Sequence, residues 1–172
     1  ANHRLFVRYS YRNQDDVPAV LFPQDIAMAE DRINQRNRMH NGVIDYTATP
    51  NATTILSVRG AYARSLYFYE NQGLGFKGSS LGLPAALDTA GGLTMFPRFS
   101  SGGYVTLGNQ DNRYNAFMTY TLAGSVTMIR GAHTWKAGYD GRLIRVNNRE
   151  SRATSGDFSF SAGFTQGPNP NT

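Results

Sequence analysis

Apolar and polar residues alternate with a period of two along several stretches of this chain. In residues 134–143, apolar or small side chains occupy the odd positions from Trp135 to Leu143, and most even positions are polar. Successive side chains of a strand point to opposite sides, so this pattern predicts a strand with one apolar and one charged face. The same reasoning predicts about six strands, at residues 5–12, 39–48, 53–69, 114–129, 134–146 and 157–164.

The connections between these strands alternate between long and short. Residues 13–38 and 70–113 are long polar or Gly/Ser-rich stretches, residues 49–52 and 130–133 are tight turns, and residues 147–156 form a third polar loop. Long loops on one side of a sheet and tight turns on the other are typical of transmembrane β-barrels. We therefore predict an all-β fold, in which an antiparallel up-and-down meander forms part of a large transmembrane β-barrel.

The first long loop contains one helical signal. Ile26, Ala29 and Ile33 recur at helical spacing, which predicts a short helix within residues 24–36.

Composition is compatible with a barrel. The chain has 172 residues, of which 40% are hydrophobic, and the mean hydropathy is −0.43. Inward-facing polar residues dilute the hydropathy of barrel proteins, and no stretch approaches the roughly 20 apolar residues of a membrane-spanning helix. The absence of cysteine excludes disulfides and thiolate metal sites. Since neither a signal peptide nor an initiator Met is visible, we expect the chain to be a fragment of a longer protein.

The net charge of +5 comes from basic residues that are scattered along the chain rather than clustered, which argues against a nucleic-acid partner. An Arg or Lys that faces lipid near the membrane midplane costs about 2–4 kcal/mol. We therefore predict that the charged strand positions face the barrel lumen, where they guide solute, dock a plug or simply balance charge. These residues are Arg8, Asp45, Arg59, Lys136, Asp140 and Arg142.

Tyr46 and Trp135 lie close to the two tight turns. In a barrel they are expected to belong to the aromatic girdle on the periplasmic side, and the alternative is ordinary packing.

Aromatic and basic side chains at the end of the third strand and in the second long loop are candidates for ligand contact. Aromatic rings beside amides and arginines suit sugar rings by stacking and hydrogen bonding. The alternatives are that these rings pack the loop onto itself or mark the outer membrane interface. Stacking on RNA or DNA bases is a further alternative, which the lack of a basic stripe disfavours. The residues are Tyr69, Phe76, Phe96, Arg98, Phe99 and Tyr104.

Other chemistry finds little support. His3, His40 and His133 lack metal-ligand spacing. Residues 73–78 match G-x-G-x-x-G, but they lie in a Gly/Ser loop with no helical pattern following, whereas a dinucleotide site requires a helix there and a βαβ unit. No serine lies in G-x-S-x-G. We expect no catalytic residue, metal or cofactor, and therefore no enzyme.

Several stretches together resemble TonB-dependent receptors, and within them the group that carries an N-terminal carboxypeptidase-regulatory-like domain. The resemblance rests on the order and spacing of RLFVRYSYR (4–12), residues 41–64, residues 96–109, HTWKAGYDGRLIR (133–145) and residues 156–170. It covers nearly the whole chain, although no single motif is strongly specific.

This resemblance implies an outer-membrane barrel of about 22 strands with a plug inside, of which residues 1–172 are a part without plug or remaining strands. It implies import of a large or scarce solute, with energy supplied by TonB acting on the plug. The implied partners are outer-membrane lipid, the plug, TonB and a solute such as an oligosaccharide or a siderophore, with no nucleic acid. The implied location is the outer membrane of a Gram-negative-type bacterium.

Two other functions stay open from the residues alone. A soluble β-sheet module that binds carbohydrate would seal its apolar faces against each other. An outer-membrane barrel enzyme would need Ser, His or Asp side chains converging at one rim.

Overall fold

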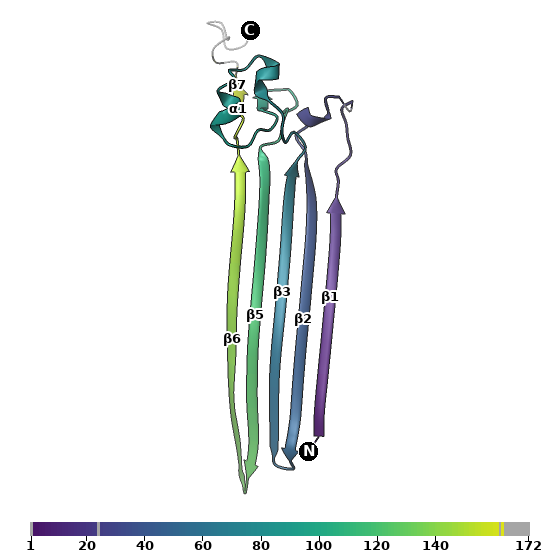
Figure 1. Ribbon diagram of the computed structural model, residues 1–172, viewed down its shortest axis with the longest axis vertical. Helices are drawn as coiled ribbons and strands as arrows, with labels where there is room; N and C mark the ends of the chain where they lie inside the picture. The colour runs from purple at the N-terminus through teal and green to yellow at the C-terminus, as the bar shows by residue number, and fades with distance from the viewer. Residues whose placement is uncertain (1, 24, 162, 164–172) are drawn as a thin grey trace. The chain divides into compact units, whose positions relative to one another are not determined.

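The computed structural model describes residues 2–23, 25–161 and 163. Long antiparallel strands dominate it and form a five-stranded sheet in the order β1-β2-β3-β5-β6 (Figure 1). Each of these strands lies beside the long strand that follows it in the chain, so the predicted up-and-down meander is confirmed. The strands are β1 (Asn2–Asp16), β2 (Ile33–Asn51), β3 (Thr54–Asn71), β5 (Asp111–Arg130) and β6 (His133–Arg152).

The remaining elements are short. They are the 3-10 helices η1 (Ala27–Ala29) and η2 (Gly78–Leu81), the helix α1 (Leu87–Ala90), and the strands β4 (Arg98–Ser101) and β7 (Asp157–Phe160). Within the described part of the chain, no helix is long and apolar enough to cross a membrane.

Two predicted elements differ from the structure. The sixth predicted strand is reduced to β7, which pairs in parallel with β4 instead of extending the meander, so Arg98 lies opposite Asp157. Phe164 and the residues after it lie outside the described residues. The predicted helix within residues 24–36 is limited to η1, because Ile33 already begins β2 and its backbone pairs within the sheet.

The long strands extend further than the apolar alternation suggested. β2 begins at Ile33 rather than Met39, and β6 continues to Arg152 rather than Val146. Strand pairing depends on backbone hydrogen bonds, which polar residues make as well as apolar ones. The added residues are polar stretches that we had assigned to loops, so those loops are shorter than predicted.

Both tight turns form where predicted, to within a residue or two. After β2, the side-chain Oδ1 of Asn51 accepts hydrogen bonds from the backbone N (3.0 Å) and Oγ1 (2.9 Å) of Thr53. Such an Asx turn reverses the chain without help from tertiary contacts. After β5, Gly131 has a φ of 58°, a conformation that glycine adopts at little cost.

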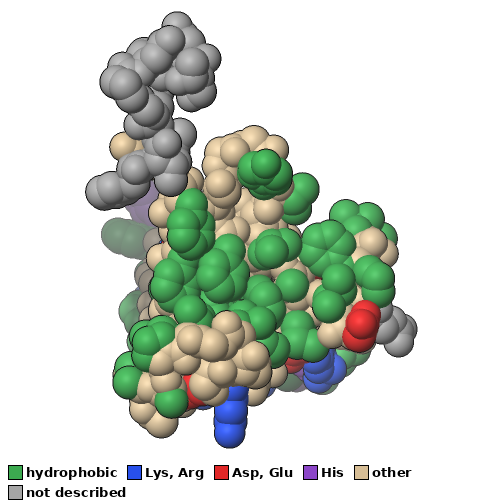
Figure 2. Space-filling view, turned by 90° about the horizontal axis from the view of Figure 1, so that it is seen from above, with side chains coloured by type: hydrophobic (Ala, Val, Ile, Leu, Met, Phe, Trp, Pro, Cys, Tyr) green, Lys and Arg blue, Asp and Glu red, His purple; other side chains and the backbone are tan. Residues whose placement is uncertain are grey.

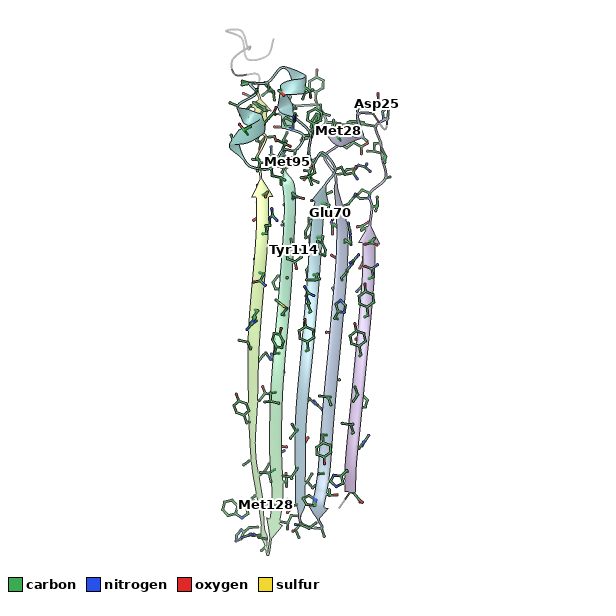
Figure 3. The ribbon with its side chains drawn as sticks, in the orientation of Figure 1. Asp25, Met28, Glu70, Met95, Tyr114 and Met128 are labelled. Carbon is green, nitrogen blue, oxygen red and sulfur yellow. The ribbon has the colours of Figure 1, made fainter. Side chains whose placement is uncertain are left out.

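The chain divides into two compact units. The strand unit comprises residues 1–14, 36–67 and 115–148, and the loop unit comprises residues 15–35, 68–114 and 149–172. The loop unit has its own small core around Met95, which is 1% exposed and is labelled in Figure 3. Its surface also carries apolar side chains, as Figure 2 shows. Leu21, Tyr104 and Val105 are the most exposed of these among the described residues.

Candidate functional site

The charged face of the strand unit is centred on an ion pair between neighbouring strands. Oδ2 of Asp45 on β2 lies 2.7 Å from Nε and 2.6 Å from Nη2 of Arg59 on β3. A Cβ built on Gly60 would lie 3.3 Å from the side chain of Ile44. Gly60 and Ile44 are therefore the neighbouring cross-strand pair, in the same register as Arg59 and Asp45. Odd positions of β2 and β3 therefore share one face of the sheet, and even positions share the other.

The same face continues across the neighbouring strands. Ser57 and Arg59 line a shallow cavity of about 250 Å³ together with Ala123 and Ser125 of β5. A Cβ on Gly138 of β6 would lie 3.3 Å from the Cβ of Ser125. Even positions of β6 therefore lie on this side as well.

Arg8 of β1 completes this side of the sheet. It lines a second shallow cavity, of about 350 Å³, whose other walls include Asn41 and Ala61. The structure thus brings all of the predicted charged positions to one face, which we name the charged face: Arg8, Asp45, Arg59, Lys136, Asp140 and Arg142. That this face lines a lumen stays a prediction.

The opposite side of the strand unit, the apolar face, carries large hydrophobic side chains that no described residue covers. Trp135 is 63% exposed, Leu122 57% and Ile44 50%. A soluble module would bury such a face, because exposed apolar patches of this kind are costly in water. The other exposed members are Leu5, Val7, Tyr9, Tyr11, Tyr46, Leu56, Val58, Tyr120, Met128, Tyr139 and Leu143. Figure 3 labels Met128 near the turn after β5.

The apolar face has the height of a membrane. On β6, Trp135 and Arg145 are ten residues apart and all odd positions between them are apolar or small. At about 3.3 Å per residue this is about 33 Å along the strand, and a tilt of about 40° reduces it to about 25 Å. Outer-membrane barrels carry an apolar band of about that height.

Aromatic rings lie at both ends of this band. At the turn end is Trp135, whereas Tyr46 is in register with Tyr139, within the band, and its hydroxyl lies 2.6 Å from Nδ1 of His3. At the other end, the rings of Tyr62 and Tyr120 have centroids 5.1 Å apart. This arrangement is typical of the girdles of membrane barrels.

The loop unit contains two cavities that we had not predicted. The first, of about 470 Å³, has aromatic, amide and charged walls. The second, of about 500 Å³, is lined almost entirely by charged and amide side chains. The first is lined by Asn34, Phe68, Tyr69, Glu70, Asn71, Leu74, Leu93, Asn112, Arg113, Tyr114 and Arg149. The second is lined by Asp31, Arg98, Asn109, Gln110, Asp111, Arg113, Arg152, Ala153 and Asp157.

Comparison with known families decides the class of the chain. The profile of a family described as an outer membrane beta barrel domain matches residues 1–172. This chain belongs to that family. Its location is accordingly the outer membrane of a Gram-negative bacterium, as predicted. No curated protein and no solved structure matches the chain.

Three of the aromatic residues predicted to contact ligand pack against one another in the loop unit of this barrel domain, and Phe96 belongs to its buried core. The ring of Phe96 lies 4.9 Å from that of Phe76 and 6.2 Å from that of Phe99. Phe99 in turn stacks on Phe158 of β7 at 5.2 Å. Phe96 is only 7% exposed, so its ring has no face left for a ligand. These residues pack the loop onto itself, which was the alternative interpretation.

The other three predicted ligand residues of the barrel domain lie apart from one another. Tyr69 lines the first cavity, with the guanidinium carbon of Arg113 4.1 Å from its ring centroid. Arg98 lines the second cavity, and Tyr104 is 81% exposed on the connection that follows β4. The structure therefore does not bring the six candidates together, and contact of Tyr69, Arg98 and Tyr104 with a ligand stays a prediction.

The two cavities combine residues from the ends of several strands and from the loops between them, which is why we missed them. One available signal was the amide-rich composition of the strand ends, such as Asn109–Asn112.

Two other kinds of site can be compared with the described part of the barrel domain, a dinucleotide site and a metal site. Gly73–Gly78 follows β3 and leads into η2, a four-residue 3-10 helix, so the α-helix that a dinucleotide site requires after the glycines is missing there. Among residues 2–23, 25–161 and 163, no three His, Asp or Glu side chains come together around a possible metal position.

Proposed function

We propose that this barrel domain is part of the wall of a TonB-dependent receptor, which imports a large or scarce solute across the outer membrane. The charged face lines the path of the solute, the apolar face contacts lipid, and the loop unit takes part in capturing the solute outside. Energy is supplied through TonB, acting on a plug that other parts of the protein provide.

One observation carries this proposal: the two faces of a single sheet differ in the way that a large channel wall requires. The apolar face is about 25 Å high from Trp135 to Arg145, which matches the apolar band of outer-membrane barrels. Both carboxylates of the strand unit, Asp45 and Asp140, lie on the other face with Arg8, Arg59 and Arg142. Charges in such number favour a water-filled interior rather than a packed one.

Strand number favours a large barrel. The described sheet has five strands, and β1 and β6 each have only one neighbour in it. Outer-membrane barrels need at least about 8 strands, and an unpaired strand edge in lipid would leave backbone groups without hydrogen bonds. Further strands must therefore close the barrel, and large plugged barrels are the class that the sequence resembles.

The first cavity of the loop unit supports capture of a polar solute with a ring-shaped scaffold. Phe68 and Tyr114 place their rings 4.9 Å apart there, beside Asn34, Asn112 and Arg149. Aromatic rings next to amides and a guanidinium suit the flat apolar faces and hydroxyl groups of an oligosaccharide, and they also suit the catechol or hydroxamate groups of a siderophore.

Dependence on energy tests the proposal. Cells that express the full-length protein would be given a labelled ferric siderophore or a labelled malto-oligosaccharide, with and without a protonophore. We expect accumulation of one of these solutes that the protonophore abolishes. Uptake of either solute that persists under the protonophore would indicate a passive pore and would overturn the proposal.

A pair of variants separates the two faces in the same assay. Removing two charges of the charged face by Lys136→Ser and Arg142→Ser should change the uptake rate at an equal amount of protein in the membrane. The matched change Leu143→Ile, on the apolar face of the same strand, should leave the rate unchanged. Equal effects of both changes would contradict the assignment of the faces.

A further inference from the structure

Basic side chains gather on the apolar face of the strand unit, at the end of the band that is far from the tight turns. The registers established by Asp45–Arg59 and Gly60–Ile44 place His40 of β2 directly opposite Arg64 of β3. We name the basic row by its four members, which are Arg38, His40, Arg64 and Arg145.

Arg145 of β6 belongs to this row because it lies on the same face and in register with Arg64 across β5. The Tyr62–Tyr120 contact sets the register of β3 and β5 and places Met118 opposite Arg64. The Gly138–Ser125 contact sets the register of β5 and β6 and places Arg145 opposite Met118. With strands about 4.8 Å apart, the backbones at Arg64 and Arg145 are about 10 Å apart.

Aromatic rings hold parts of the row in place. Nδ1 of His40 lies 2.7 Å from the hydroxyl of Tyr9, and the ring of Tyr11 is 4.8 Å away. The guanidinium carbon of Arg145 lies 5.9 Å from the ring centroid of Tyr120. The basic groups therefore begin where the aromatic girdle ends, at the level at which a membrane passes from hydrocarbon to headgroups.

No acidic side chain of the strand unit balances this row. The carboxylates of the unit belong to Asp45 and Asp140, and both lie on the charged face. Nε of Arg38 and Nε of Arg64 are shielded from water and have no hydrogen-bond partner among the described residues. Because these Nε atoms are covered, an anion from the lipid side would meet the terminal Nη atoms of the guanidinium groups, whose charge no acidic side chain of the strand unit offsets.

We propose that the basic row binds the phosphate groups of an anionic lipid in the outer leaflet. The tight turns of outer-membrane barrels are periplasmic, so the opposite end of the apolar band meets the outer leaflet. Guanidinium groups bind phosphate oxygens through short, charge-assisted hydrogen bonds, and the acyl chains of the same lipid would cover the exposed side chains of the apolar face. This inference requires the barrel location but not import of a solute.

Lipid binding to the full-length protein tests the inference. The detergent-solubilised protein would be titrated with lipid A that carries its phosphates and with dephosphorylated lipid A, and bound lipid would be counted by native mass spectrometry. We expect the double variant Arg64→Gln, Arg145→Gln to weaken binding of the phosphorylated lipid about tenfold or more. Binding of the dephosphorylated lipid should be weak for both proteins.

Two further variants make the result decisive. Arg12→Gln removes a cation at a similar level of the sheet but on the opposite face, because Arg8 and Arg12 are both at even positions of β1 and therefore point to the same side. This variant should change the affinity for lipid less than about twofold. Arg64→Lys with Arg145→Lys keeps the charges and should recover part of the affinity lost in the glutamine variant. Heat-modifiable migration on gels verifies that each variant is folded.

Three results would overturn the inference. The first is that the double glutamine variant binds phosphorylated lipid A as tightly as the unmodified protein, or that Arg12→Gln weakens this binding as much as the double variant does. The second is equal binding of phosphorylated and dephosphorylated lipid A, which would indicate an apolar contact only. The third is displacement of the lipid by millimolar inorganic phosphate, which would indicate a site for free phosphate.

Discussion

A charge placed in the middle of the apolar face should destabilise the barrel far more than the same charge on the charged face. Leu122 on β5 lies opposite Gly141 on β6, near the middle of the span from Trp135 to Arg145. Leu122→Arg therefore places a guanidinium close to the membrane midplane. Ser125→Arg, three residues along the same strand, is the matched control on the opposite face.

The size of the effect follows from the surroundings of each position. An Arg on the lipid side of the midplane costs about 2–4 kcal/mol. The leucine side chain is 57% exposed on the sheet and would contact lipid there, and losing that contact adds about 1–2 kcal/mol. The expected loss is about 3–6 kcal/mol, or between about two and four powers of ten in the folding equilibrium.

The control position has room for a long side chain. Ser125 lies beside Gly138 and lines the open cavity that contains Ser57 and Arg59. Repulsion by Arg59, a diagonal neighbour, is the main expected cost, and like charges on neighbouring strands cost less than about 1 kcal/mol.

The measurement is reversible unfolding of the full-length protein in lipid vesicles by guanidinium, followed by heat-modifiable migration and tryptophan fluorescence. The difference between Leu122→Arg and Ser125→Arg is the decisive quantity. If the two variants lose equal stability, or if Ser125→Arg loses more, the assignment of the apolar face to lipid is refuted.

Three further predictions concern the loop unit. Gly108 has a φ of 75°, and backbone atoms fill the place that a Cβ would occupy, so Gly108→Ala should increase the protease sensitivity of the loops. Gly103 has a φ of 85° with open space around it, so Gly103→Ala should increase this sensitivity much less. The side chain of Glu30 is only 6% exposed, and its Oε1 accepts hydrogen bonds from the backbone amides of Leu21 (2.8 Å) and Phe22 (2.5 Å). Glu30→Ala should therefore speed hydrogen exchange at these two amides, and unchanged exchange would contradict this role. A side-chain hydrogen bond from Ser79 lowers the pKa of Asp88 below its ordinary value of 3.8. The stabilisation is therefore present above that value and is lost as the pH falls through the lower, folded pKa; Ser79→Ala should raise the pKa of Asp88 in an NMR titration.

The strands and their faces were largely predictable from the sequence. Alternation from Trp135 to Leu143 identified both β6 and the side that carries Lys136 and Asp140. The prediction succeeded because the period of two follows from strand geometry alone and because a membrane wall keeps its two faces chemically distinct along the whole span.

The strand ends and the loop unit were not predictable in the same way. Beyond Val146 both faces of β6 are polar, so the alternation that marks a strand disappears although the backbone pairing continues to Arg152. Phe96 and Phe99 were expected to meet a ligand, because a sequence does not distinguish an exposed ring from one packed against another ring. The contact of Phe99 with Phe158 joins segments far apart in the chain.

The sequence by itself determined that this chain forms long two-faced strands joined by tight turns on one side, since these features depend on local geometry and on turn residues such as Asn51 and Gly131. Only the tertiary structure decided which residues meet across strands. Register brought Asp45 to Arg59, and it aligned Arg64 with Arg145 across β5. Those assignments require backbone pairing between segments that are distant in sequence, and a shift of one residue would move every side chain of a strand to the other face.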